Sequence, residues 1–153
     1  MHITNMILSL SQTPSVVRRV VEGLSESDML ADHQPDDWGI GPVLVHMRDV
    51  ERTYIGRITR MIDEDNPYLL DFDEKADMRA TTVRPGDVAA ALDEFGDLRR
   101  QTVALIESID EDRPGVHSRV GPVSVYYSGR HLVSHDLQHI GQIVLHNRWR
   151  RCP

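Results

Sequence analysis

The segment HLVSHDLQHIGQ, residues 131–142, sets three histidines at four-residue steps in a stretch that is typical of a helix. Residues four apart lie on the same face of a helix, one turn above the other. Two imidazoles held in this way can bind one transition metal ion, as the paired histidines of H-E-x-x-H sites do. The segment therefore predicts a long helix whose histidines are either metal ligands or an ordinary polar stripe.

Apolar residues that recur at intervals of three and four residues indicate helices in four parts of the chain. Alternating patterns that would indicate strands are weak. These expected helices cover residues 11–24, 42–62, 87–109 and 124–148, with a short helical piece over 3–10 as an option before the first. Thr13 followed by Pro14 fits the start of the first helix, and Ser124 fits the N-cap of the last.

Two connections in this pattern are long. Residues 63–84 form an acidic, irregular crossover, and residues 110–121 are expected to be a loop. Some four-helix bundles need a long connection of this kind. We therefore expect an all-α protein, a four-helix bundle with a long crossover between helices 2 and 3, in a single domain over residues 1–153.

The composition limits the classes of protein to which the chain can belong. A net charge of −7 argues against a nucleic-acid binder that works through a broad basic surface, and against binding to acidic membranes. No apolar run approaches the roughly 18 residues that a membrane-spanning helix needs. The single Cys152 excludes an internal disulfide and fits a reducing compartment. We expect a cytoplasmic protein with no nucleic-acid or membrane partner.

A helical wheel separates the three histidines of the last helix. His131 and His139 lie about 40° to either side of His135, so they are about 80° apart, too far for all three to share one ion comfortably. The opposite side of the helix is apolar and needs a cover, from another helix or from a second subunit. It consists of Val133, Leu137, Ile140 and Val144.

Two helical histidines make only half of a metal site, because a catalytic metal usually has three protein ligands and an open position. His46 is the one histidine within another expected helix, and it borders the apolar face of residues 42–62. The alternative is that His46 is not a ligand but a histidine in or beside the core whose hydrogen bonds are satisfied within the protein. Asp49, on the same side, could accept a hydrogen bond from an imidazole and fix its tautomer. Other sources of a third ligand are His2, His33 and His117.

Two segments together resemble the motifs of the DinB/YfiT-like family. Residues 38–51, WGIGPVLVHMRDVE, are similar to the W-x-x-x-x-[V/I]-L-x-H-L-x-D-x-E pattern of the family's second helix. Residues 135–143, HDLQHIGQI, are similar to the H-E-x-x-H-x-G-Q-[I/L] pattern of its last helix. Residues 95–99 and 121–125 also look like the family's third helix and the start of its fourth. The resemblance covers nearly the whole chain, in the right order.

This resemblance implies a four-helix bundle with a three-histidine metal site. The ligands would be His46, His135 and His139, and the ion would be a divalent transition metal, with zinc and nickel as the first choices. Family members often dimerise, so we expect a homodimer.

Further residues, in these motifs or one turn before the last of them, are expected near the ligands rather than on the ion. Asp49, His131 and Gln142 would lie behind the ligands or in a pocket wall. Trp38 is expected to fill the core at the start of the second helix. Asp136 stands where many relatives have Glu, which leaves the role of its carboxylate open.

Similar proteins include bacillithiol- or mycothiol-dependent S-transferases and a mycothiol-dependent isomerase. The resemblance therefore implies a metal-dependent enzyme that acts on a small-molecule substrate by thiol S-transfer, with a low-molecular-weight thiol as cofactor, or by hydrolysis. Arg57 and Arg99 could hold an anionic substrate, or serve in structural pairing. Two alternatives stay open: a non-catalytic, stress-associated metal-binding or scaffold bundle, and a metal-free bundle whose histidines form a polar stripe between helices.

Overall fold

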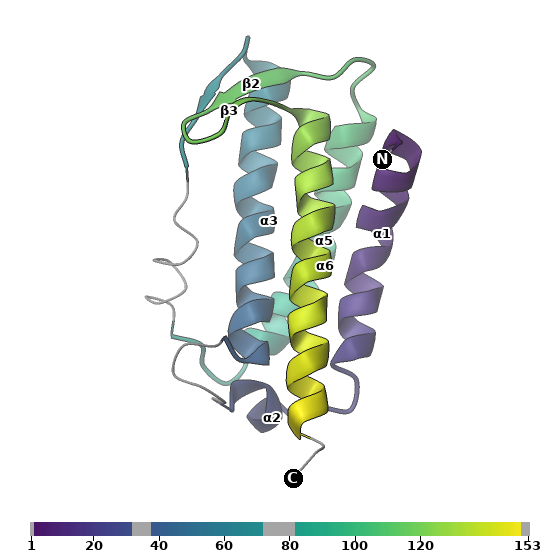
Figure 1. The fold of residues 1–153 in the computed structure, drawn as a ribbon, viewed down its shortest axis with the longest axis vertical. Coiled ribbons are helices and arrows are strands. Elements are labelled where there is room, and N and C mark those ends of the chain that lie inside the picture. Colours follow the sequence, from purple (N-terminus) through teal and green to yellow (C-terminus); the bar gives the residue numbers. More distant parts are fainter. Residues whose placement is uncertain (1, 32–37, 72–81, 151–153) are drawn as a thin grey trace.

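The computed structural model describes residues 2–31, 38–71 and 82–150. For residues 149 and 150 only the backbone is described. Within the described residues four long helices lie side by side, as expected for a four-helix bundle (Figure 1). They are α1 (Ile3–Val20), α3 (Ile40–Asp63), α5 (Asp87–Glu107) and α6 (Val125–Arg150). The short helix α2 (Glu26–Leu30) lies near the start of α3, and three short strands lie at the opposite end of the bundle.

The order of the helices explains the long crossover. Each helix packs against two neighbours, in the ring order α1, α5, α3, α6. Helices α3 and α5 both run toward the strands, whereas α1 and α6 run away from them (Figure 1). Two parallel neighbours need a connection that returns from one end of the bundle to the other, which explains why as many as 23 residues separate the end of α3 from the start of α5.

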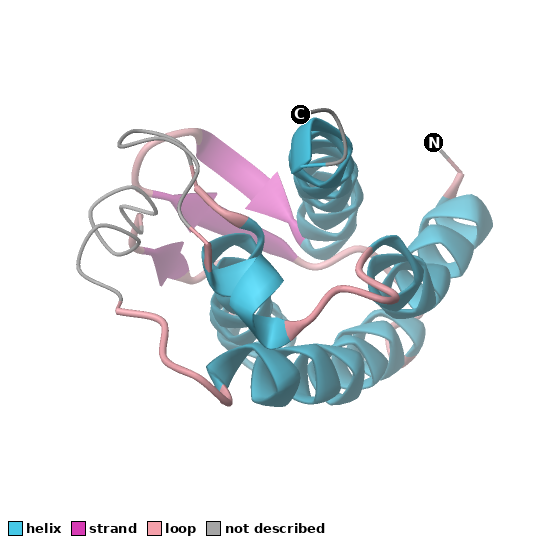
Figure 2. Cartoon of the chain, turned by 90° about the horizontal axis from the view of Figure 1, so that it is seen from below, coloured by secondary structure: helices cyan, strands magenta, loops and turns pink. Residues whose placement is uncertain are grey.

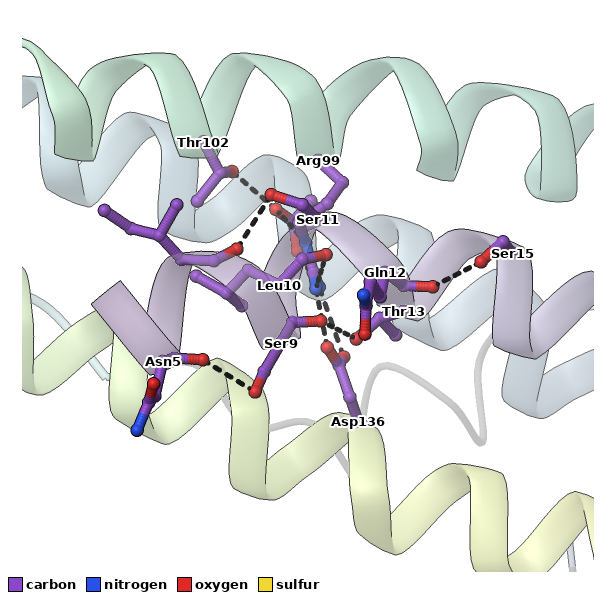
Figure 3. Close-up of polar contacts among 12 residues, drawn as sticks. Asn5, Ser9, Leu10, Ser11, Gln12, Thr13, Ser15, Arg99, Thr102 and Asp136 are labelled. Atoms are coloured by element: carbon purple, nitrogen blue, oxygen red, sulfur yellow. Dashed lines mark hydrogen bonds and ion pairs between the residues drawn. The ribbon is translucent and has the colours of Figure 1, made fainter. Parts of the chain in front are cut away.

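The expected start of the first helix is wrong. Helix α1 is continuous from Ile3, so Thr13 and Pro14 lie inside it. Proline has no N–H to donate to the carbonyl four residues earlier, which leaves the Leu10 oxygen without its helical donor. The Arg99 side chain, buried between helices, donates from Nη1 to this oxygen at 3.4 Å (Figure 3). A tertiary contact thus replaces the lost helical hydrogen bond.

The expected loop over residues 110–121 is also wrong, because it contains strands. Strand β2 (Pro114–His117) pairs antiparallel with β3 (Gly121–Ser124), and β1 (Tyr68–Leu69), from the crossover, pairs parallel with β2. Figure 2 shows these strands gathered beside the start of α6. The expected N-cap is confirmed, since the Ser124 hydroxyl accepts a hydrogen bond from the Tyr127 N–H at 3.1 Å.

The core is divided into two apolar clusters by a polar layer. The cluster near the strands includes Met6, Val50, Ile58, Leu69, Ile106 and Leu132. The cluster near α2 includes Val17, Met29, Val43, Met47, Phe95 and Ile143. Between them, all four long helices contribute buried polar side chains. This polar layer consists of Thr13, His46, Glu51, Arg99, Thr102, His135, Asp136 and His139.

The apolar side of α6 is only partly covered. Val133 is buried, whereas Leu137 and Val144 are 66% and 45% exposed. The homodimer expected from the resemblance stays a prediction. None of the described helices is long and apolar enough to cross a membrane.

Candidate metal centre

Three histidine side chains of the polar layer converge on one point. His46 comes from α3, and His135 and His139 come from successive turns of the neighbouring α6. The Nε2 atom of His135 lies 3.0 Å from Nε2 of His46 and 3.1 Å from Nε2 of His139. All three side chains are buried. The structure thus brings together the three residues that the motifs single out, His46, His135 and His139, which we call the histidine triad.

The spacing of these nitrogens fits one metal ion. Nitrogens bound about 2.0–2.1 Å from one ion are about 3.3 Å apart at the tetrahedral angle and about 2.9 Å apart at a right angle. The two short Nε2–Nε2 distances of the triad lie between these values, and the ligand atoms of all three residues lie within 4.8 Å of one another. Three protein ligands leave at least one coordination position for another group.

Gln142 fixes the tautomer of His139. The Gln142 side-chain N–H donates to the Trp38 carbonyl at 3.4 Å, which turns its Oε1 toward His139. That oxygen lies 3.1 Å from Nδ1 of His139 and can only accept. The proton of His139 therefore sits on Nδ1, and the lone pair of Nε2 faces the centre of the triad. This is the orientation that a metal ligand needs.

Trp38 closes one side of the triad. Its ring stacks on His139, with centroids 6.0 Å apart and planes 10° from parallel. The same ring meets His46 edge-on at 4.9 Å. Trp38 thus packs against ligands from both helices, as a core plug would. Its carbonyl also holds Gln142 in place.

Burial keeps the imidazoles uncharged. It lowers the pKa of His46 to about 4, with His139 adding to the effect. It lowers the pKa of His135 to about 2, again with help from the neighbouring imidazoles. Burial also lowers the pKa of His139, and the hydrogen bond with Gln142 opposes this shift. The neutral imidazole is the form that binds a metal, so the triad is ready to act as a donor set near neutral pH.

Sequence comparison identifies the family. The pattern of the DinB superfamily matches residues 9–143. The chain belongs to the DinB superfamily. A Bacillus licheniformis protein named "Putative metal-dependent hydrolase" is 24% identical over 143 residues, which cover 91% of this chain and 81% of that protein.

A solved structure supports the fold of this DinB-superfamily chain. YfiT from Bacillus subtilis, described as "a probable metal-dependent hydrolase with an unusual four-helix bundle topology", matches with a TM-score of 0.86. The match covers 96% of this chain and 86% of YfiT, at 20% identity. At that identity the likeness establishes the shared bundle and leaves the activity to be argued from the site.

Asp49 acts on the triad through its charge. Its carboxylate accepts hydrogen bonds from Arg48 at 2.8 Å and from Arg52 at 3.3 Å. Among the described residues it makes no hydrogen bond with His46, although the sequence suggested one. Its negative charge raises the pKa of His46 and so opposes part of the effect of burial.

His131 lies beside the triad rather than in it. Its ring stacks on Tyr54, with centroids 5.4 Å apart, and lies 6.3 Å from the ring of His135. The helical wheel anticipates this separation. In this DinB-superfamily chain, two of the three histidines spaced four apart in α6 thus belong to the triad, and the third, His131, lies next to it.

Asp136 has a structural partner that the sequence did not reveal. Its carboxylate accepts hydrogen bonds from Arg99 at 2.6 and 3.2 Å (Figure 3). Arg99 donates in turn to Glu51 at 2.9 and 2.7 Å. The Thr102 hydroxyl also donates to Glu51. Arg99 is only 1% exposed, so it serves in structural pairing and is enclosed away from any substrate.

The charges of this buried group depend on one another. Although burial alone lowers the pKa of Arg99, the two carboxylates raise it above its ordinary value. Burial raises the pKa of Asp136, and Arg99 partly offsets that change. The group joins α3, α5 and α6 at the level of the triad, which holds the helices that carry the three histidines in a fixed relation.

Proposed function

We propose that this protein is a metal-dependent hydrolase whose divalent ion is held by His46, His135 and His139. The observation that carries the proposal is the convergence of three buried, neutral imidazoles at ligand spacing. The names given to the relatives from B. licheniformis and B. subtilis point to the same chemistry. Zinc and nickel suit an all-imidazole donor set, and carboxylate-preferring ions suit it less well.

The chain's own residues would prepare the site in three ways. Gln142 aims the lone pair of His139 at the ion. Trp38 covers His46 and His139, which keeps water away from that side. When bound, a divalent ion supplies Lewis-acid chemistry, because it polarises a substrate oxygen and lowers the pKa of water. The substrate would be a small molecule that reaches the remaining coordination position.

Thiol S-transfer is the second candidate reaction. The donor set favours a borderline-soft ion, and such ions also bind thiolates well. A low-molecular-weight thiol of the bacillithiol or mycothiol type would then be the cosubstrate. The same three histidines would serve either reaction.

Metal analysis of protein purified without a histidine tag tests the site. We expect close to one divalent ion per chain, and a large loss of metal in His135→Ala. His131→Ala is the matched control, because it removes an imidazole one turn away on the same helix and should keep the ion. Absence of a divalent ion, together with equal metal affinity in wild type and His135→Ala, would refute the site.

Activity screens then separate the reactions. Metal-loaded and chelator-treated protein would be assayed on carboxylic esters, amides and phosphate esters, and separately for thiol transfer with bacillithiol, mycothiol and glutathione. Metal-dependent turnover of an ester or amide without thiol supports hydrolysis, and turnover only with a thiol supports S-transfer. A metal-loaded protein that turns over none of them favours the non-catalytic bundle.

A further inference from the structure

A pocket lies between the strands and helices α3 and α6, next to the histidine triad. Its lining comes from the second half of α3, the three-stranded sheet and the first turns of α6. The residues that matter for the argument are Tyr54, Arg57, His117, Arg119, Ser128 and His131. None of them belongs to the triad.

Stacked rings connect this pocket to the triad. Tyr54 and His131 are nearly parallel in the pocket wall, 5.4 Å apart, and His131 stacks in turn at 6.3 Å on His135. His131 and His135 are one helical turn apart, so the pocket begins about 6 Å along the helix axis from the triad. A small molecule bound in the pocket would therefore lie close to the triad.

Arg57 gives the pocket a cation. Its guanidinium donates one hydrogen bond, to the Leu70 carbonyl at 2.7 Å, and lies 5.2 Å from the Tyr54 ring centroid. A guanidinium has five N–H donors, so most remain available. Within the described ranges 2–31, 38–71 and 82–150, no carboxylate forms an ion pair with Arg57.

The other charged groups of the pocket compensate one another. Arg119 pairs with Asp71 at 2.7 Å, and Asp71 also lies 3.5 Å from Nε2 of His117. His117 accepts a hydrogen bond at Nδ1 from the Arg119 N–H, so its proton is on Nε2. Burial, with Arg57 nearby, lowers the pKa of His117 and favours its neutral form. The positive charge of Arg57 is thus left without compensation from these groups.

Ser128 adds a polar group to the pocket floor. The residue is only 4% exposed and lines the pocket. Among the described residues its hydroxyl oxygen makes no hydrogen bond, and it is not one of the fully enclosed polar atoms that lack a partner, so it stays accessible from the pocket. An accessible hydroxyl can donate a hydrogen bond to a ligand. Leu69, Val120 and Val123 supply an apolar wall.

We propose that this pocket binds the substrate of the metal centre through an anionic group, a carboxylate or a phosphate. Arg57 pairs with the anion, the Ser128 hydroxyl donates to it, and the apolar wall packs on the carbon skeleton. The proposal rests on the proposed function for the identity of the ligand as substrate. The anion site itself can be tested without the metal.

The test is a titration of metal-free protein with inorganic phosphate and, separately, with acetate, followed by amide chemical shifts in NMR spectra. Without metal, an anion cannot give a signal by coordinating at the triad. We expect saturable shifts in the pocket amides with at least one of the two anions, and the anion that binds more tightly identifies the group. Arg57→Gln should weaken binding about tenfold or more, because it removes a charge-assisted contact.

Arg60→Gln is the matched control. Arg60 lies one turn later on α3 and also donates to a carbonyl of the crossover, that of Tyr68, but it lies outside the pocket. It should leave anion binding unchanged. Ser128→Ala tests the site a second time, with an expected smaller loss of affinity, should Arg57→Gln alter the fold.

The outcomes separate this proposal from the previous one. No saturable shift with either anion, or equal affinity in wild type and both pocket variants, overturns the anion site even if the protein proves to be a metal-dependent hydrolase. Binding that depends on Arg57 in a protein that takes up no metal supports the anion site and refutes the metal centre.

Discussion

His135 and Asp136 are consecutive in α6, yet their side chains join two different groups of the same polar layer. Nε2 of His135 lies 3.0 Å from His46, whereas Oδ2 of Asp136 lies 2.6 Å from Nη1 of Arg99. Successive residues of a helix point about 100° apart, so one turn of α6 can serve the triad on one side and the buried ion pairs on the other. The triad is therefore positioned by a group that does not contact it.

Arg99 should be one of the largest single contributors to stability. Arg99→Met leaves the Glu51 and Asp136 carboxylates buried without their cation, and breaking a buried pair in this way costs about 3–5 kcal/mol. Urea unfolding would measure the free energy of unfolding. Arg100→Met makes the same substitution one residue later, in an exposed pair with Asp97, and should cost less than about 1 kcal/mol. Similar losses in the two variants would contradict the structural role of Arg99.

Gln142 should affect metal affinity more than stability. Gln142→Leu removes the acceptor that holds the proton on Nδ1 of His139, and loss of such a partner typically weakens metal binding by about 10–100-fold. Competition with a chromophoric chelator would measure the affinity. Gln138→Leu, one turn earlier on α6 and exposed, is the control and should bind metal like the wild type. Equal affinities in the two variants would show that the tautomer is set by another group.

Two glycines of α6 should respond differently to alanine. A Cβ at Gly141 would meet nothing within 4 Å, so Gly141→Ala should stabilise the protein by about 0.5–1 kcal/mol through helix propensity. A Cβ at Gly129 would lie 2.7 Å from Sδ of Met6 and 3.2 Å from Ile106, so the close packing of α6 on α1 and α5 should cancel or reverse that gain. Thermal unfolding of both variants tests the difference, and an equal rise in Tm would contradict it.

The sequence predicted that the three histidines of the triad belong together because the signals that mark them lie in short segments of the chain. His135 and His139 share a face through helix geometry alone, and the motif around His46 supplied the third residue. The four helices were likewise visible as apolar periodicity. The network of Glu51, Arg99 and Asp136 was not, because its pairing depends on how three helices are rotated against one another, and periodicity does not set that rotation.

The errors have similar causes. Pro14 indicated a helix start, but a distant side chain, Arg99, satisfies the carbonyl that proline leaves free. Strands β2 and β3 are four residues long and contain proline and glycine, so their local signal is weak. They pair with each other, and β2 also pairs with β1 from the crossover, a contact distant in the sequence. The pocket around Arg57 is formed by the same long-range pairing. This explains why the sequence did not indicate that Ser128 lines a pocket, and why it suggested His117 only as a possible third metal ligand.

The metal-free protein should lose stability in mild acid. Burial lowers the pKa of His46 to about 4 and that of His135 to about 2, whereas both would titrate near 6.5 in the unfolded chain. Below pH 6.5 the unfolded state therefore binds more protons than the folded state, and the free energy of unfolding falls as the pH falls toward these lowered values. Between pH 7 and 5 each histidine should contribute a loss of about 1–2 kcal/mol.

Urea unfolding of chelator-treated protein at pH 7 and pH 5 would measure this loss. His135→Gln removes one of the three buried histidines whose pKa is lowered, so its free energy of unfolding should change less between the two pH values than that of the wild type. Comparing the two proteins cancels the titration of the carboxylates that they share, including Asp136. An identical pH dependence in both would show that His135 is not held in its neutral form by burial.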